Sequence, residues 1–124
     1  MSRARDRLGA IAFGRRAEWV AAAFLTAKGW RVLARGYRVR GGEIDVIARR
    51  GATVIFVEVK ARPTLDEALI AITPGKIARM SRAARYWLAA NPWASGCVLR
   101  GDAVFLAPWR WPTHLADAAP LRLD

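Results

Sequence analysis

Short runs of mainly apolar residues, some alternating with polar ones and one apolar on both faces, are separated by glycine-containing turns and fill the middle of the chain. Such runs, rich in valine, isoleucine and phenylalanine, are typical of β-strands that pack on a core. The pattern is found in four segments: residues 30–38, 43–49, 53–60 and about 97–107. We expect turns at Gly41-Gly42 and Arg50-Gly51 and a bulge at Gly36.

Residues 14–28 have the helical period instead, and Gly29 is placed to end this helix. One arc of the helix carries most of its larger apolar side chains, and we expect this arc to face the core. Its members are Trp19, Val20, Ala23, Phe24 and Ala27. Glu18 lies off the arc, among Ala21, Ala22 and Leu25, so the helix presents one carboxylate to a small apolar neighbourhood.

Residues 74–90 form the second long predicted helix, opened by Pro74 and ended by Asn91-Pro92. Its predicted core side is Ile77, Met80, Ala84, Trp87 and Leu88, and its basic side is Lys76, Arg79, Arg82 and Arg85. We also expect a short helix at residues 66–72 and a helical turn within residues 112–118. Strands mixed with helices in this way predict an α/β domain, with a mixed central sheet flanked by helices.

The charge of the chain points to a polyanionic partner. It has 21 Lys and Arg residues against 10 Asp and Glu residues, a formal net charge of +11. A field of this sign attracts nucleic acid first and an anionic membrane surface second, and a genome that uses arginine freely is the alternative explanation. With a single cysteine the chain cannot form an internal disulfide. With only one histidine in addition, it lacks the ligands for a zinc site built from cysteine and histidine. Because no segment has the apolar length of a membrane span, we expect a reduced, soluble, cytoplasmic protein.

The strand pair 43–49 and 53–60 ends in acidic residues and a lysine, where apolar residues are usual. A two-residue loop would place Asp45 diagonal to Glu58, and a four-residue loop would place the two residues directly opposite. Both registers put Asp45, Glu58 and Lys60 on one face of the sheet. Burying these charges is unfavourable unless something compensates, and a divalent cation held by carboxylates would do so.

The oxygen ligands of Asp45 and Glu58 favour Mg²⁺ or Mn²⁺ over zinc. Such a metal suits phosphodiester hydrolysis, because it lowers the pKa of a water molecule and stabilises charge on the phosphate. Lys60 could orient or deprotonate that water or neutralise the phosphate, and Glu18 could complete the site through water. For Glu-x-Lys by itself, an ordinary salt bridge is the favoured interpretation. The glycine-flanked Glu43-Ile44-Asp45 on the partner strand shifts the balance toward a site.

Other features are weaker indications of nucleic-acid binding. Phosphate contacts are expected from Arg35, Arg40, Lys76, Arg79, Arg82 and Arg85, although a solvated surface explains the basic helix face equally well. Trp109-Arg110-Trp111 could stack on exposed bases, but core or dimer surface is the commoner role of tryptophan. A Ser-His-Asp hydrolase is not favoured, because His114 stands in a proline-rich tail and no serine has a nucleophile-elbow context.

Two motifs occur in this order and spacing: Gly41-Gly42-Glu43-Ile44-Asp45 and Ile55-Phe56-Val57-Glu58-Val59-Lys60. They resemble the YraN family of small bacterial proteins, which is similar to the restriction-endonuclease-like nucleases and nearest to archaeal Holliday-junction resolvases. The resemblance covers about residues 10–106. It implies that Asp45 binds metal, that Glu58 and Lys60 form the Glu-x-Lys pair, and that Glu18 is the helical glutamate. Ala61 departs from the family pattern, where a polar residue follows the lysine.

We therefore expect one restriction-endonuclease-like domain over residues 1–124, with a basic N-terminal tail at 1–9 and a Pro/Trp-rich C-terminal tail at 108–124. The expected function is that of a Mg²⁺- or Mn²⁺-dependent endonuclease on DNA, which we favour over RNA, with selectivity for DNA structure. The alternatives are a catalytically silent nucleic-acid-binding module and a basic accessory protein that docks a protein partner. Whether two chains pair as a homodimer is left open, and no membrane association is expected.

Overall fold

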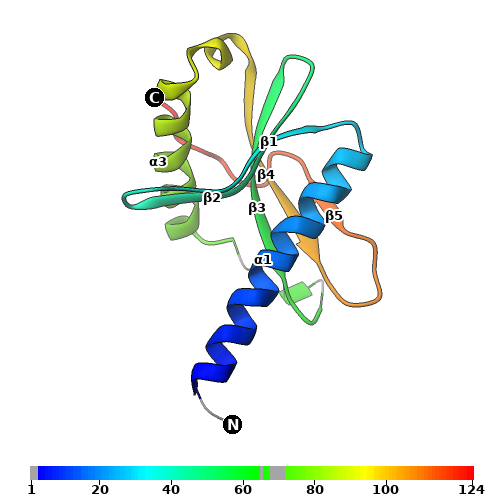
Figure 1. Ribbon diagram of the computed structural model, residues 1–124. Coiled ribbons are helices and arrows are strands. Elements are labelled where there is room, and N and C mark those ends of the chain that lie inside the picture. Colours follow the sequence, from blue (N-terminus) through cyan, green and yellow to red (C-terminus); the bar gives the residue numbers. More distant parts are fainter. Residues whose placement is uncertain (1–2, 65, 68–71) are drawn as a thin grey trace.

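The computed structural model contains a five-stranded mixed sheet flanked by two helices (Figure 1). The structure describes residues 3–64, 66–67 and 72–124, with side chains from residue 15 onward. Its elements are α1 (Arg3–Ala27), β1 (Arg31–Val39), β2 (Gly42–Arg50), β3 (Thr53–Ala61), α3 (Pro74–Ala90), the 3₁₀ helix η1 (Pro92–Gly96), β4 (Val98–Leu106) and β5 (Thr113–Leu115). None of the helices in these ranges has the length and apolar content needed to cross a bilayer.

The strands lie side by side in chain order, from β1 to β5. Neighbours are antiparallel except β3 and β4, which are parallel and are connected through α3. The four predicted strands are thereby confirmed. In the β2–β3 hairpin Arg50 pairs with Thr53, so the turn is Gly51-Ala52 and not Arg50-Gly51. The bulge of β1 lies between Val32 and Ala34, and its prediction at Gly36 was wrong.

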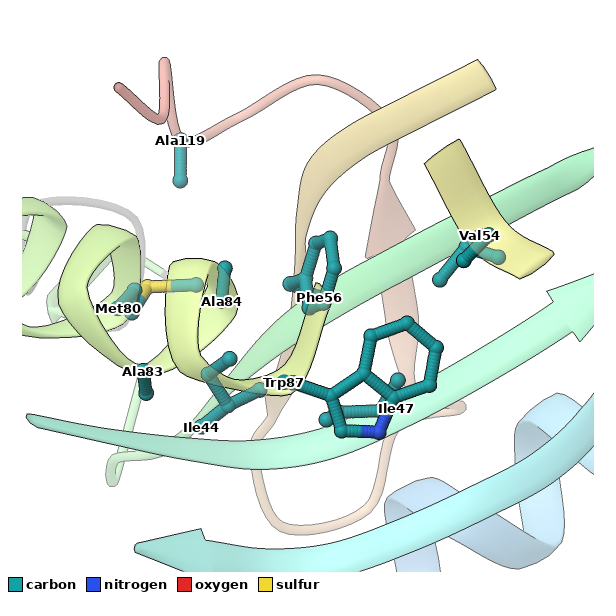
Figure 2. Packing of buried hydrophobic residues seen from close by; sticks show 10 residues of the cluster. Ile44, Ile47, Val54, Phe56, Met80, Ala83, Ala84, Trp87 and Ala119 are labelled. Atoms are coloured by element: carbon teal, nitrogen blue, oxygen red, sulfur yellow. The ribbon is translucent and has the colours of Figure 1, made fainter. Parts of the chain in front are cut away.

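Helix α3 packs on one face of the sheet and confirms the predicted helix at residues 74–90. The Thr73 side chain caps its first turn by accepting the Lys76 N–H at 3.2 Å. The buried contacts on this face join Met80, Ala83, Ala84 and Trp87 of α3 to Ile44, Ile47, Val54 and Phe56 of the sheet (Figure 2). The Phe56 and Trp87 rings meet edge to face at 5.7 Å, a favourable aromatic geometry.

Helix α1 packs on the opposite face, but not through the predicted arc. Trp19 is 61% exposed and Val20 is 40% exposed, whereas the buried side chains are Ala17, Ala21, Ala22 and Leu25. The small alanines let the helix lie close over the valines and isoleucines of β2 and β3, a contact that an indole ring would prevent. Of the predicted arc, Phe24 packs partly against this core, whereas Trp19 and Val20 face away from it. The helix also begins at Arg3, earlier than the predicted start at residue 14, so residues 3–9 are helical.

The C-terminal segment adds an unpredicted strand. β5 pairs with β4 through Ala103, Val104 and Phe105, where a helical turn within residues 112–118 was predicted. That prediction was wrong because long-range contacts of β4 select the extended conformation, as described below. Residues 66–67 are helical, and residues 68–71 of the predicted short helix lie outside the described part of the chain.

Candidate active site

The β2–β3 ladder stops short of the acidic residues. Its last pair is Val46 and Val57, so the register extends toward Asp45 opposite Glu58, the second of the two predicted arrangements. Beyond this pair the Val59 N–H donates to a side chain instead of to a backbone carbonyl: Asp45 Oδ2 accepts this hydrogen bond at 2.7 Å. This hydrogen bond holds the Asp45 carboxyl between the diverging ends of the two strands.

The Asp45 carboxyl lies in an unfavourable electrostatic environment. Burial raises its pKa from 3.8 to about 8, and the negative charge of Glu58 is the second cause. The Val59 N–H acts in the opposite direction, while Glu18 and Glu43 raise the pKa further. The charged form of Asp45 is therefore short of positive partners in this conformation.

Glu18 reaches Asp45 from α1. Burial raises the pKa of Glu18, while a hydrogen bond with Asp45 and the positive charges of Arg38 and Arg35 lower it. Gly36 on β1 lies beside this contact: its φ of +61° is a left-handed conformation that favours glycine, and a Cβ there would be in ordinary van der Waals contact with Glu18 Oε2 at 3.5 Å. The glycine that sequence analysis assigned to a bulge thus provides a left-handed backbone position beside the acidic group.

Glu58 and Lys60 form a buried ion pair near the end of β3. Lys60 Nζ lies 3.1 Å from Glu58 Oε1, and the two side chains are only 10% and 3% exposed. Lys76, from the first turns of α3, adds a second ammonium at 3.6 Å from the same oxygen. The salt bridge considered above is therefore present, but it is buried and shared with α3 rather than exposed where the strand emerges.

Glu43 belongs to the same group, although sequence analysis assigned it no role. Its Oε1 lies 3.7 Å from both Lys76 Nζ and Arg79 Nη2, and its Oε2 lies 3.6 Å from Arg38 Nε. Gly42 allows α3 to come this close, because a Cβ at Gly42 would meet the Arg79 carbonyl oxygen at 2.6 Å. The position of Glu43 in the Gly-Gly-Glu-Ile-Asp motif was the available signal.

The described carboxylates are not arranged around a common metal position. Within the described residues, no group of three or more acidic, histidine or cysteine side chains is arranged to hold a metal ion together. The donor chemistry nevertheless fits a divalent cation at Asp45 and Glu58, because added positive charge would relieve the repulsion that raises the Asp45 pKa. A cation there would compete with Lys76 for Glu58.

The predicted phosphate-binding residues lie mostly on one side of the molecule, along α3 and the β1–β2 turn. Arg82 Nε donates to the Arg40 carbonyl oxygen at 2.7 Å, and Arg85 Nη1 donates to the Arg122 carbonyl oxygen at 2.6 Å. Both arginines remain exposed at the surface, whereas Arg79 and Lys76 are directed to Glu43. Arg35 is near enough to Glu18 to lower its pKa.

A second buried acid lies on β4. Asp102 is fully buried, and it accepts hydrogen bonds from Arg100 at 2.8 and 2.9 Å and from the Asp117 N–H at 2.9 Å. His114 Nε2 lies 2.7 Å from Asp102 Oδ2, and Lys28 Nζ lies 2.8 Å from His114 Nδ1. These contacts attach β5 to β4 and lower the Asp102 pKa to about 2, against the effect of burial. Sequence analysis missed this role of His114, because the contacts join distant segments.

Comparisons with known proteins agree with the motifs. The family model described as "Uncharacterised protein family UPF0102" matches residues 17–106. A UPF0102 protein of Methylocella silvestris is 59% identical over 121 residues, which cover 98% of each chain. Those of Methylobacterium nodulans and Rhodopseudomonas palustris (strain HaA2) are 52% and 49% identical, over 95% and 94% of this chain and 92% and 94% of theirs. The expected YraN relationship is confirmed at this level: the chain belongs to the uncharacterised protein family UPF0102.

Proposed function

We propose that this protein is a metal-dependent endonuclease with a restriction-endonuclease-like fold, which hydrolyses phosphodiester bonds in DNA. The Asp45 carboxyl carries this proposal. It lies between the diverging ends of β2 and β3, its pKa is raised to about 8, and Glu18, Glu43 and Glu58 all contribute negative charge around it. Strongly perturbed acids of this kind cluster at functional sites more than elsewhere.

The chain's own residues suit the reaction. When bound at Asp45 and Glu58, Mg²⁺ or Mn²⁺ would acidify a water molecule and stabilise negative charge on the scissile phosphate. Lys60, held 3.1 Å from Glu58 Oε1, offers an ammonium donor to that water or to a phosphate oxygen. Glu18 approaches Asp45 from the other side, where it would orient the water. Catalysis is thus divided between two strands and one helix.

The basic surface around the site would hold the DNA backbone. Arg40, Arg82 and Arg85 are exposed, and the net charge of +11 favours a polyanion. Each neutralised phosphate steepens the dependence of log K on log salt by about 0.9. Reversing Arg82 and Arg85 to Glu should therefore weaken binding to every duplex alike and flatten the salt dependence. Unchanged DNA affinity in this double variant would show that the two arginines contact solvent and not DNA.

The decisive experiment is a cleavage assay with Mn²⁺ on linear duplex, single-stranded, flap and four-way-junction DNA. We expect Asp45→Asn to cut at least about 10³-fold more slowly while its affinity for DNA in EDTA stays equal or rises. Lys60→Ala should lose rate without losing Mn²⁺ affinity. Asp66→Asn, at an exposed aspartate, is the matched control and should cut like the wild type. A wild type that cuts none of these substrates and binds no Mn²⁺ would end the nuclease proposal.

One observation favours a second candidate, a silent nucleic-acid-binding module. Glu58 is already held by Lys60 and Lys76, so its charge is balanced without a metal. If the protein is such a module, Glu58→Gln should leave DNA binding unchanged and should affect only the stability of the fold. Calorimetric titration of the wild type with Mn²⁺ separates the two candidates, because only the nuclease requires a cation site that Asp45→Asn removes.

A further inference from the structure

A cavity of about 540 Å³ opens beside α1, at the carboxyl ends of β3 and β4. Ala17 and Val20 of α1 form one apolar side, and Ala61, Leu106 and Pro108 form the other. Its volume lies within the range of about 300–1,000 Å³ that is usual for pockets that bind small organic groups. The apolar lining therefore suits a planar or aliphatic group rather than a fully hydrated ion.

Three arginines also line this cavity: Arg16, Arg62 and Arg110. All three are exposed, and in the described ranges none forms an ion pair with a carboxylate. Arg62 Nη1 donates to the Ala61 carbonyl oxygen at 2.8 Å, which holds this guanidinium beside the cavity. Guanidinium groups around an apolar lining match a ligand that combines a flat apolar part with phosphate.

Two tryptophans flank Arg110 at the surface. Trp109 is 103% exposed and Trp111 is 87% exposed, so neither is part of the core. Trp109 also has a φ of +63°, a left-handed conformation that is strained for a bulky residue. Two exposed indoles, one of them in a strained backbone, are typical of a ligand-binding surface. Indole faces stack on nucleobases of any sequence.

The cavity adjoins the candidate active site through two elements. Ala61 directly follows Lys60 at the end of β3, and Ala17 directly precedes Glu18 on α1. Strand alternation puts Ala61 and the cavity on the α1 face of the sheet, whereas Glu58 and Lys60 lie toward Lys76 on the α3 face. A strand of nucleic acid with one base in the cavity would therefore pass around the end of β3 to reach the acidic residues. A paired base enters only at the cost of unstacking and unpairing it from the duplex, whereas an unpaired base is already available.

We propose that this cavity binds an unpaired nucleobase of single-stranded DNA, with Arg16, Arg62 and Arg110 on the adjoining phosphates and Trp109 or Trp111 stacked on a neighbouring base. The proposal takes its ligand class from the proposed function and deepens it. The preferred substrate is DNA with an unpaired strand, such as an overhang or flap, rather than continuous duplex. The selectivity arises from the cavity and not from the metal.

The test measures binding without metal, so it is independent of cleavage. Fluorescein-labelled oligo-dT and a duplex of the same length are titrated with protein in EDTA and followed by anisotropy. We expect Ala107→Trp, which fills the cavity, and Trp109→Ala, which removes a stacking surface, each to weaken oligo-dT binding about tenfold. Duplex binding should change less than about twofold. Val98→Ala, at an exposed apolar side chain at the opposite end of β4, is the control and should bind both DNAs like the wild type.

Equal oligo-dT affinity in the wild type and both cavity variants would overturn the proposal, and so would equal weakening of oligo-dT and duplex. If the wild type but not Ala107→Trp binds a fluorescent peptide of alternating leucine and aspartate, while oligo-dT affinity is unchanged, the cavity serves an acidic protein partner instead. If the wild type binds oligo-dT through the cavity but cuts no DNA, only the nuclease proposal fails. If Ala107→Trp cuts flap and duplex at the wild-type ratio, only the cavity proposal fails.

Discussion

Asp45 and Asp102 are two acids withdrawn from solvent within one sheet, yet their surroundings are opposite in charge. Asp102 accepts from Arg100, from His114 and from a backbone N–H, and its pKa falls to about 2. Asp45 accepts from one backbone N–H among other carboxylates, and its pKa rises to about 8. Burial acts on both carboxyls in the same direction. The difference therefore lies in how many donors and cations the protein itself provides.

This contrast separates a structural acid from a candidate functional one. The partners of Asp102 come from within the described chain, and they attach β5 to β4, so its charge is used in folding. The charge of Asp45 destabilises the fold unless a cation or a proton arrives. A buried acid without sufficient partners is a stronger sign of a site than a buried acid as such.

The two aspartates should respond oppositely to removal of their charge. Asp102→Asn takes the charged partner of Arg100 and His114 away at a fully buried position, so the free energy of unfolding should fall by about 3 kcal/mol. Asp45→Asn removes a carboxyl that has to take up a proton on folding at pH 7, and it keeps an acceptor for the Val59 N–H, so the free energy of unfolding should rise by about 1–2 kcal/mol. Urea unfolding at pH 7 in EDTA measures both, with Asp66→Asn as the near-neutral control. Equal losses in the two variants would contradict the comparison.

The pH dependence of stability should separate the same residues. Between about pH 4 and 8 folded Asp45 retains a proton that the unfolded chain has lost, because its pKa rises from 3.8 to about 8. Stability should therefore fall as pH rises through this window, and Asp45→Asn should remove the slope. For Asp102 the unfolded chain binds the proton between about pH 4 and 2, so this contribution is complete above pH 4 and lost on acidification. It amounts to about 2 kcal/mol.

A divalent cation should stabilise the protein through Asp45 and not through Asp102. With Mn²⁺ at tenfold its dissociation constant, binding to the folded state alone adds about 1.4 kcal/mol, which raises the melting temperature by a few degrees. Asp102→Asn should show the same increase above its own, lower melting temperature without Mn²⁺. Asp45→Asn should show no increase. Differential scanning fluorimetry, with NaCl at matched ionic strength as the control, makes the measurement. An increment retained by Asp45→Asn would place the cation elsewhere.

The smallest effect concerns the carboxylates around Asp45. Both Glu58→Gln and Glu43→Gln should lower the Asp45 pKa, and Glu58→Gln should lower it more, because Glu58 is the larger electrostatic cause. A ¹³C NMR titration of the aspartate side-chain carboxyls resolves the two shifts. Neither variant should move the Asp102 pKa. If the order of the two variants is reversed, Glu43 is the closer electrostatic neighbour of Asp45.

The strand and helix pattern was readable from the sequence because it depends on local periodicity. The four main strands and the helix from Pro74 to Ala90 follow from alternation, capping and proline placement. The buried face of α1 did not follow in the same way. Side-chain size favoured the arc with Trp19 and Val20, but the close approach of the helix to the sheet selects the alanine arc instead. Periodicity gives the faces of a helix, and the packing distance decides which face is buried.

The candidate site likewise contains some groupings that the sequence could predict and some contacts that it could not. Asp45, Glu58 and Lys60 could be grouped from sequence, because strand alternation and a short hairpin restrict the register to a few choices. The role of Gly36 beside Glu18, the bridge of Lys76 between Glu43 and Glu58, and the dependence of Asp102 on His114 could not. These contacts join segments far apart in the chain. Their geometry, and hence the charge that each acid experiences, exists only once α1, α3 and β5 have packed on the sheet.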